Sequence, residues 1–367
     1  MLVLSEDQTM LMESARGAVA AKAPIAEFRK LRADPHGDGF SRVFWRECAE
    51  LGWTGVLVPE EFGGIDFGVT GAGLIAREMG RQLAPSPFLS TSVLSASALR
   101  RAGSAPQKAE WLPRIARGEA IVAFALDEGP RPGAISAKAT PTASGWRLDG
   151  AKHFVLDGQV ADAFVIAAEA DGDATLFLAK ADAPGLARDA RTLVDGRRVA
   201  SVTLDGLLVD AGARLHGGAA TIAEVVDIGR AVLAAALCGV AEEAFSRTAS
   251  YLKERRQFDR RIGSFQALQH RAARMHIDIE NAWSASLKAL QAIDGQANSV
   301  PLDVAIAKAK ASDTACAATA ECLQMHGGIG MTDEFDIGLF LKRARVDSVL
   351  FGDGPFHADR VASMLGY

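Results

Sequence analysis

Residues 251–266, YLKERRQFDRRIGSFQ, place basic, amide and aromatic side chains at close spacing. Arginine suits phosphate because its planar guanidinium donates two parallel hydrogen bonds. Gln257 and Gln266 can both donate and accept, as the polar edge of a nucleotide requires, and Phe258 and Phe265 can cover a ring. The pattern predicts a phosphate-bearing ligand. The alternative is a solvated basic helix end, because cations favour helix C-termini.

A second candidate is the glycine-rich run QMHGGIG at residues 324–330. Its glycines let the backbone approach a ligand closely, and their N–H groups, with a helix expected to begin near Asp333, can receive an anion. A simple helix stop is the alternative. The sequence has no Gly-x-Gly-x-x-Gly, Walker or Gly-x-Ser-x-Gly pattern, which argues against a Rossmann site, a P-loop and a hydrolase elbow.

Arg230 and Arg255 are 25 residues apart on one expected helix. That spacing is about seven turns, so both side chains point to the same side, roughly 37 Å apart. One small ligand cannot contact both. They serve two sites, or one serves a neighbouring subunit; the alternative is an i−3 pair between Arg230 and Asp227.

Composition narrows the class of protein. The 367 residues are 49% hydrophobic with a net charge of −5, which excludes a disordered chain and disfavours nucleic acid as a partner. The apolar stretch 231–241 is far shorter than the ~20 residues of a membrane span, and the N-terminus lacks a signal pattern. Four cysteines without Cys-x-x-Cys spacing and seven scattered histidines predict no metal site, and indicate free thiols in the cytoplasm.

Three regions follow one another along the chain. Residues 1–118 are predicted to form an N-terminal helical domain, 119–215 a middle antiparallel β-barrel or sandwich, and 216–367 a C-terminal four-helix bundle. The dipeptide Asp-Gly, a tight-turn signal, begins at positions 149, 157, 171, 195 and 205. Strands are expected at residues 121–126, 152–156, 163–168, 175–179 and 199–204. The main helices are expected at 71–82, 91–102, 219–256, 264–294 and 301–325. The fold class is therefore α+β with several domains.

Five segments in order resemble the acyl-CoA dehydrogenase family nearly from end to end. They are LGWTGVLVPEEFGG at 51–64, GEAIVAFALDE at 118–128, LDGAKHFVLDG at 148–158, the Arg255-x-Gln-Phe and Phe265-Gln pair, and QMHGGIG at 324–330. The resemblance implies FAD bound between subunits, α,β-dehydrogenation of an acyl-CoA, and electron transfer flavoprotein as the acceptor. A glutamate of such enzymes removes the α-proton while flavin N5 takes the β-hydride.

The resemblance also assigns residues. Those matching the family's cofactor-binding positions are Arg255, Gln257, Phe258, Phe265, Gln266, Gln324, Gly327 and Gly328, toward a partner's FAD, with Phe124, Leu126, Phe154 and Leu156 in the β domain. Asp227 and Arg230 match positions near the acyl-CoA.

The departures concern catalysis. The usual base position holds Phe351, and the position used by a second subgroup holds Gly229; neither side chain accepts a proton. Leu156 replaces the threonine that meets flavin N5. DEGPRPG at 127–133 replaces the usual Thr-Glu-Pro-x-x-Gly-Ser, and Asp259 replaces a glycine.

These losses make the chain similar to the base-lacking subunit of bacterial heteromeric, α2β2 acyl-CoA dehydrogenases of sterol and dicarboxylate degradation. Two alternatives stay open. One is a self-sufficient homotetramer with a relocated base, for which Asp353 is the first candidate and Asp227 the second. The other is a non-catalytic flavin- or CoA-binding relative.

Overall fold

The computed structural model describes residues 3–34 and 36–367. The chain divides into two compact units. The bundle unit contains the residues up to Arg29, Gly73–Ala84 and Arg230–Tyr367, and the sheet unit contains Lys30–Ala72 and Pro85–Gly229. Each unit is described by itself below.

The N-terminal third is helical, as predicted. Its α-helices are α1 (Glu6–Lys22), α2 (Ile25–Ala33), α3 (Arg42–Glu50), α4 (Val69–Arg81), α5 (Ala96–Ala102) and α6 (Ala105–Ala116), with short 3₁₀ turns η1 (Trp53–Gly55) and η2 (Glu60–Phe62). Helix α1 begins with a capping box: Gln8 N donates to Ser5 Oγ and Ser5 N to Gln8 Oε1, both at 3.1 Å. The helix expected at 91–102 begins instead as a π-helix, η3 (Phe88–Ser95), and π-helices often mark functional sites.

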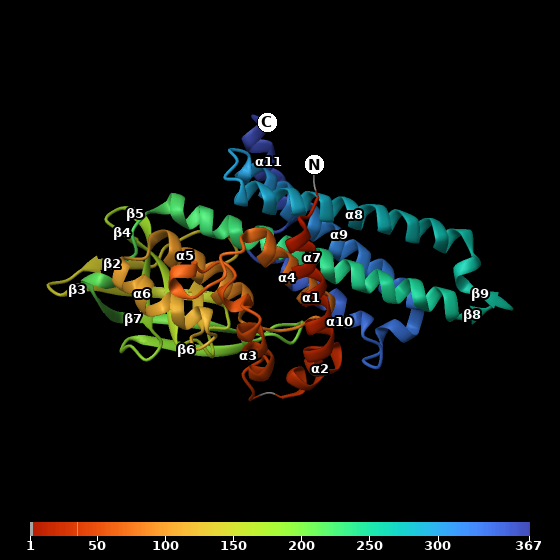
Figure 1. The fold of residues 1–367 in the computed structure, drawn as a ribbon, viewed down its shortest axis with the longest axis horizontal. Helices are drawn as coiled ribbons and strands as arrows, with labels where there is room; N and C mark the ends of the chain where they lie inside the picture. Colours follow the sequence, from red (N-terminus) through yellow and green to blue (C-terminus); the bar gives the residue numbers. More distant parts are fainter. Residues whose placement is uncertain (1–2, 35) are drawn as a thin grey trace. The chain divides into compact units, whose positions relative to one another are not determined.

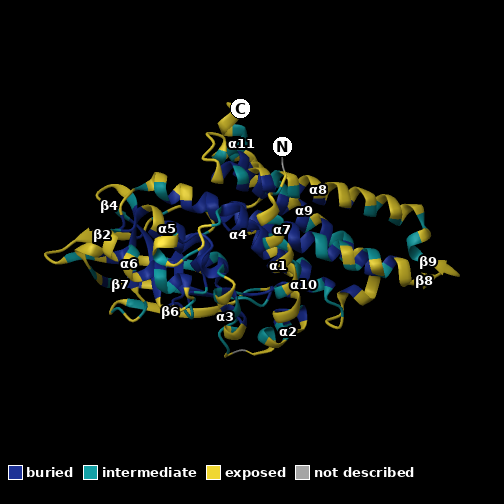
Figure 2. Ribbon diagram, viewed as in Figure 1, coloured by how far each residue is buried: buried dark blue, intermediate teal, exposed yellow. Residues whose placement is uncertain are grey.

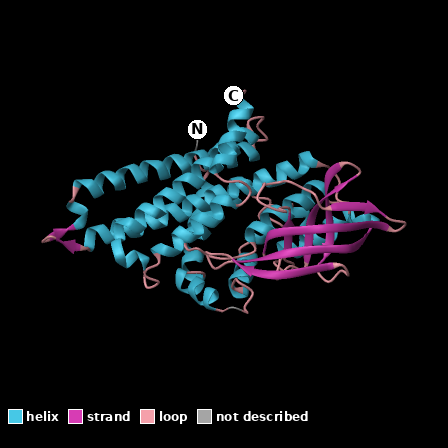
Figure 3. Cartoon of the chain, turned by 180° about the vertical axis from the view of Figure 1, so that it is seen from behind, coloured by secondary structure: helices cyan, strands magenta, loops and turns pink. Residues whose placement is uncertain are grey.

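The middle region forms one curled sheet, coloured magenta in Figure 3. Its strands are β1 (Val122–Ala125), β2 (Lys138–Pro141), β3 (Gly145–Leu156), β4 (Ala163–Ala170), β5 (Asp173–Lys180), β6 (Leu186–Thr192) and β7 (Arg198–Asp210), in the order β1-β4-β2-β3-β7-β6 with β5 on β4. The β domain is confirmed, but β4 runs parallel to β1 and to β2, so the sheet is mixed rather than antiparallel throughout. Strands β2 and β6 were not predicted; β6 is largely exposed and polar, without the apolar signal of a strand.

The Asp-Gly pairs separate into turns and bulges. Asp171-Gly172 closes the β4–β5 hairpin, as predicted, and Asp195-Gly196 lies between β6 and β7. The predicted turns at 149 and 205 are wrong, because both pairs lie inside long strands. The β3–β7 register shifts there, and Asp149 Oδ1 accepts a hydrogen bond from Gly206 N at 2.9 Å. The same residue types thus serve a β-bulge, which also needs unusual φ angles.

The C-terminal third returns to helix, as predicted. It contains α7 (Ala219–Glu254), α8 (Gln266–Asp294), α9 (Val300–His326), α10 (Ile337–Val349) and α11 (Gly354–Leu365), with the small hairpin β8 (Arg256–Gln257) and β9 (Arg260–Arg261) between α7 and α8 (Figure 1). Short 3₁₀ turns η4 (Ala211–Ala213), η5 (Ile262–Ser264) and η6 (Gly327–Met331) complete the described elements. Helix α7 is continuous, so Arg230 and Arg255 lie near opposite ends of its bundle portion.

Each unit has a hydrophobic core of its own. In the sheet unit, Ala163–Ala168 of β4 is buried throughout, which explains why this run is apolar without alternation (Figure 2). In the bundle unit, α4 packs closely on the alanine-rich part of α7: a Cβ at Gly80 or Gly239 would collide with a backbone carbonyl of the other helix. No helix in the described part of the chain is long and apolar enough to cross a membrane.

Candidate cofactor and substrate site

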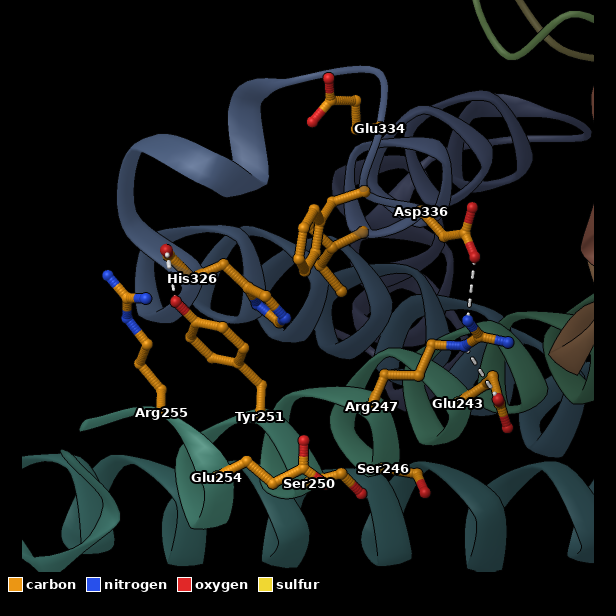
Figure 4. A pocket seen from close by; sticks show the side chains of 12 residues that line it. Glu243, Ser246, Arg247, Ser250, Tyr251, Glu254, Arg255, His326, Glu334 and Asp336 are labelled. Carbon is orange, nitrogen blue, oxygen red and sulfur yellow. Dashed lines mark hydrogen bonds and ion pairs between the residues drawn. The ribbon is translucent and has the colours of Figure 1, made fainter. Parts of the chain in front are cut away.

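A pocket of about 880 Å³ in the bundle unit lies beside the C-terminal half of α7 (Figure 4). It is lined by Glu243, Ser246, Arg247, Ser250, Tyr251, Glu254, Arg255, His326, Glu334, Phe335, Asp336 and Ile337. These residues come from α7, from the last residue of α9 and from the segment that leads into α10. The basic segment and the glycine-rich segment singled out in the sequence therefore border one cavity.

An aromatic wall joins these two segments. The rings of Tyr251 and His326 stack at 4.4 Å with 20° between their planes, and Phe335 meets both edge-on. Tyr251 Oη donates to the His326 carbonyl at 3.5 Å. On the far side of the pocket Arg247 binds Glu243 and Asp336, each at 3.0 Å. The stack fixes the end of α7 to the end of α9, so Arg255 and Gln324 emerge at the same end of the bundle unit.

We call residues 255–261 the basic hairpin. Phe258 and Asp259 form its tip with φ of 54° and 59°, and the Phe258 side chain is 83% exposed. Aspartate tolerates this left-handed conformation better than most residues, so the loss of the family glycine at 259 leaves the turn intact. Phe265 packs behind the tip, edge-on to Phe258 at 6.1 Å and under the Arg260 guanidinium at 4.1 Å.

The glycine-rich segment forms an open turn at the end of α9. Gly327 has φ of 65°, and a Cβ at Gly327 or Gly328 would meet nothing within 4 Å. Gln324 is exposed, as are Gln257 and Gln266. Exposed amides, an exposed Arg255 and an unobstructed glycine backbone are suitable donors for a phosphate-bearing ligand.

We call residues 350–353, which contain the usual base position, the base loop. Phe351 is 7% exposed with φ of 57°, and its carbonyl accepts from Arg230 Nε at 2.9 Å and from His357 Nε2 at 3.2 Å. Lys308, fully buried in α9, donates to the carbonyls of Asp347, Ser348 and Gly352 at 2.9–3.2 Å. Side chains from α7, α9 and α11 therefore hold the backbone of this loop.

Burial sets the charge of these groups. Burial, helped by Arg230 and Lys308, lowers the pKa of His357 to about 3, so its imidazole is neutral and Nε2 carries the proton given to Phe351. Burial also lowers the pKa of Lys308 to about 7, whereas Asp347 raises it. The three carbonyls that accept from Lys308 favour the ammonium form, which has three protons to donate. The base loop is thus bound by donors and holds no side-chain base at position 351.

The three other positions considered for the base, Asp353, Gly229 and Asp227, lie in different surroundings. Asp353 caps α11, where its Oδ1 accepts from Phe356 N at 2.9 Å, and the residue is exposed. At Gly229 a Cβ would come within 2.5 Å of Leu94 Cδ2, so a glutamate there requires Leu94 to move. Asp227 is 4% exposed.

The flavin-facing candidates meet in the sheet unit, where β1 ends beside β3. His153 N donates to the Asp127 carbonyl at 2.7 Å, and the buried Lys152 ammonium binds Glu128 and the Leu126 carbonyl. Glu128 also accepts from Ser136 N at 2.7 Å, so it fixes the 127–137 loop although most of the family motif there is replaced.

Within β3, Phe154 stands out. It is 54% exposed with φ of 53°, at a shift of the β3–β7 register. Phe124, Leu126 and Leu156 nearby are buried and apolar. An exposed aromatic side chain on a strained backbone is suited to stacking on a planar ring. Leu156, however, has no hydroxyl to donate to that ring.

The fold and these segments together define a class of flavin-dependent dehydrogenases. Residues 5–119 match the acyl-CoA dehydrogenase N-terminal domain and residues 216–366 the acyl-CoA dehydrogenase C-terminal domain, so the chain belongs to the acyl-CoA dehydrogenase family. Members of this family are FAD-dependent oxidoreductases that act on acyl-CoA.

Its relatives include several mycobacterial proteins. The acyl-CoA dehydrogenase FadE27 of Mycobacterium tuberculosis is 32% identical over 338 residues, covering 89% of this chain and 88% of the relative. A chain of the ChsE4–ChsE5 complex from Mycobacterium tuberculosis superposes with a TM-score of 0.93 at 29% identity, covering 100% of this chain and 98% of that one. A chain of a variant of the Tcur3481–Tcur3483 steroid ACAD gives 0.90 at 30% identity, with 98% of each chain covered.

Sequence reasoning missed Lys308, His357 and the Tyr251–His326 stack. Lys308 and Lys310 are both flanked by alanines in the run AIAKAKA at 305–311, so the sequence has no signal that separates the buried lysine from its neighbour. The prediction that Arg230 lies near the substrate is not tested; what the structure adds is its bond to the base loop.

Proposed function

We propose that this chain is one subunit of a heteromeric acyl-CoA dehydrogenase whose partner chain supplies the catalytic carboxylate. The observation that carries the proposal is a contrast between lost and retained positions. Phe351 and Gly229 stand where the family places its base, whereas Arg255, Gln257, Phe258, Gln266 and Gln324 are retained and exposed around the C-terminal end of α7.

The residues present fit FAD in part. Arg255, the Gln324 amide and the open Gly327–Gly328 backbone, all in the bundle unit, provide donors for the pyrophosphate of a partner's FAD. Separately, Phe154 in the sheet unit provides a face for a flavin ring. FAD, when bound, accepts the hydride from the β-carbon of the acyl group. We assign to this chain the holding of the cofactor; a carboxylate from the partner removes the α-proton, since position 351 holds a phenyl ring.

Substrate and partners follow from the same proposal. The similarity to a chain of the ChsE4–ChsE5 complex and to a steroid ACAD supports a two-chain assembly and an acyl-CoA from a steroid side chain. Arg230 and Asp227 lie near the CoA thioester in this proposal. Electron transfer flavoprotein as electron acceptor and a cytoplasmic location stay predictions.

Co-expression tests the proposal. The chain is purified alone and after co-expression with candidate paralogous dehydrogenases that carry the glutamate, and bound FAD and acyl-CoA turnover are measured. We expect FAD and turnover in the co-purified assembly, with turnover at least ~100-fold lower in the lone chain, the usual contribution of a general base. Full FAD content and turnover in the lone chain would contradict the heteromer.

A homotetramer with a relocated base is the second candidate, favoured by the exposed carboxylate of Asp353 two residues from the usual base position. Asp353→Asn keeps the cap on α11 through its amide oxygen but cannot accept the α-proton. Unchanged turnover in this variant removes Asp353 as the base. Absence of flavin bleaching by any acyl-CoA, in the lone chain and in the assembly, indicates a non-catalytic relative.

A further inference from the structure

A pocket of about 530 Å³ lies in the sheet unit and shares no residue with the candidate cofactor and substrate site. It is lined by α6, by β5 with the turn that follows it, and by the end of β7 with η4. We call this pocket the strand gap, because it separates residues 178–184 from residues 208–213. Its lining combines two strand edges, a buried hydrogen-bond donor and several carboxylates.

The backbone on the two sides of the strand gap is joined only at the ends. At one end an isolated bridge pairs Phe177 with Arg214, and at the other end Asp205 N donates to the Gly185 carbonyl at 2.9 Å. Between these two points no backbone hydrogen bond of the described chain crosses the gap. The two stretches therefore diverge between their joined ends, which leaves room for a further segment of backbone.

Both sides of the gap are strand edges. Strand β6 pairs only with the first half of β7, so residues 207–210 have β3 on one side and no described strand on the other. On β5, the Leu176 carbonyl points away from β4, since it accepts from Leu215 N at 2.8 Å. Backbone groups of alternate residues point the same way along a strand, so those of Leu178 and Lys180 also face away from β4. Such edges are templates for pairing with another extended chain.

Trp111 of α6 presents an unused hydrogen-bond donor to the gap. The residue is 3% exposed and lines the gap, and within the described chain its indole N–H has no acceptor. Its Nε1 is not among the fully enclosed polar atoms, so part of that small exposed area belongs to this nitrogen. Arg114 lies over the indole, 4.8 Å from the ring centroid, which fixes the orientation of the ring. Because buried donors are normally paired, the acceptor is expected from a molecule inside the gap.

The rim of the gap carries more negative than positive charge. Glu110, Asp182 and Asp210 are exposed and line the gap, and none of their carboxylates has a hydrogen bond or an ion pair to a described residue. Among the described residues of the lining, Lys180 is the one cation. Leu208, 63% exposed, lies two residues before Asp210 and so on the same face of β7. The lining therefore favours a ligand that combines positive charge with an apolar side chain.

We propose that the strand gap binds an extended, basic segment of another polypeptide. The backbone of this segment pairs with the edges of β5 and β7, and one of its carbonyls accepts from the Trp111 indole. Its lysine or arginine side chains reach the three carboxylates of the rim. A free cation satisfies the carboxylates alone and leaves the strand edges and the indole unpaired, which favours a peptide. The inference does not depend on the function proposed above.

Nuclear magnetic resonance of the full chain tests the proposal, because its five tryptophans give five indole N–H signals and Trp111→Phe identifies one of them. The probe is a capped peptide of alternating lysine and valine, added to about 1 mM. We expect this peptide to shift the Trp111 signal, and a peptide of alternating glutamate and valine to leave that signal in place. No shift with the lysine peptide, or equal shifts with both peptides, overturns the proposal.

A modified peptide tests the pairing of the backbone. The lysine peptide with an N-methylated backbone keeps its charges but cannot pair with strand edges, so its affinity should fall at least ~10-fold. Equal affinity of the two peptides, or an equal shift with free lysine, overturns the proposal, because either result requires only a cation.

Two variants test the carboxylates. Glu110→Gln combined with Asp182→Asn should weaken binding of the lysine peptide about 3- to 10-fold. Glu61→Gln is the matched control: it removes an exposed carboxylate of η2 outside the gap, and the affinity should stay unchanged. Equal affinities of the two variants overturn the role of the rim. A Trp111 signal that shifts with the concentration of the chain alone indicates a second copy as the occupant and also overturns the proposal.

Discussion

The base loop and the basic hairpin lie in the same unit and have changed in opposite ways. The base loop has a buried, hydrogen-bonded backbone, and Phe351 stands at the position that the family resemblance assigns to the base. The basic hairpin keeps its arginines, glutamine and phenylalanine and presents them to solvent. The base loop is therefore held by hydrogen bonds but has no carboxylate at position 351, whereas the basic hairpin presents ligand-binding side chain types to solvent.

The difference follows from burial. In the interior every carbonyl needs a donor, so Lys308, Arg230 and His357 retain their bonds whether or not a base is present. An exposed guanidinium is satisfied by water and contributes little until a ligand or partner covers it. Arg255 and its neighbours are exposed and contribute little to the stability of the fold, so their presence is better explained by binding. The proposed assembly rests on this point.

The base loop is expected to give the largest effect. Replacing Lys308 with Met leaves three buried carbonyls without their donor, so we expect a loss of about 3 kcal/mol in the free energy of unfolding, measured by urea denaturation. Lys310→Met on the same helix is the control: Lys310 is half-buried and paired with the exposed Asp278, and its loss should cost under about 0.5 kcal/mol. Equal losses of stability in the two variants would show that the bonds from Lys308 to the base loop and its flanking carbonyls are no stronger than an ordinary surface ion pair.

The basic hairpin should show the reverse behaviour. In the assembly with its partner, Arg255→Ala is expected to weaken FAD binding about 10- to 100-fold, the size of a lost charge-assisted hydrogen bond, with little change in melting temperature. Arg256→Ala, one residue further along, lies outside the pocket lining and serves as the control. FAD affinity that is unchanged in Arg255→Ala would argue for a solvated helix end.

A smaller effect is expected in the sheet unit, and it depends on pH. Because the folded state raises the pKa of Asp157 from 3.8 to about 6, its contribution to stability is full below about pH 4 and is lost as the pH rises through about 6. Asp157→Asn should therefore gain about 1–3 kcal/mol over the wild type between those pH values and hold that gain above them. Unfolding curves at several pH values measure this difference. Asp171→Asn, which removes an exposed carboxylate paired with Arg214, is the control, and its difference from the wild type should not change with pH.

The smallest effect concerns Phe258. Its side chain is 83% exposed, so Phe258→Ala should change the free energy of unfolding of the lone chain by under about 0.5 kcal/mol. If the tip packs on a cofactor or a partner, the same change should weaken assembly by about 1 kcal/mol. Sedimentation of each chain mixed with its partner measures this. Equal assembly by the wild type and Phe258→Ala would show that only the polar residues of the basic hairpin contribute to binding.

The regular elements could be predicted because their signals are local. The 36-residue α7, the capping box of α1 and the runs of β1, β4 and β5 follow from periodicity, caps and apolar runs within a short window. Strand β6 and the bulges at Gly150 and Gly206 could not be, since a polar edge strand looks like a loop and Asp-Gly serves turns and bulges alike.

The sequence by itself determined the family, the order of helical and β regions, and the absence of a carboxylate at positions 351 and 229. Only the tertiary structure decided what holds those positions in place. The bond from Arg230 to the Phe351 carbonyl spans 121 residues, that from Lys308 to Gly352 spans 44, and that from Ser90 to Asp157 spans 67. The type of a residue determines which hydrogen bonds it can make. Which of them it makes depends on its burial and on the acceptors nearby, and both are fixed only when segments distant in the sequence pack together.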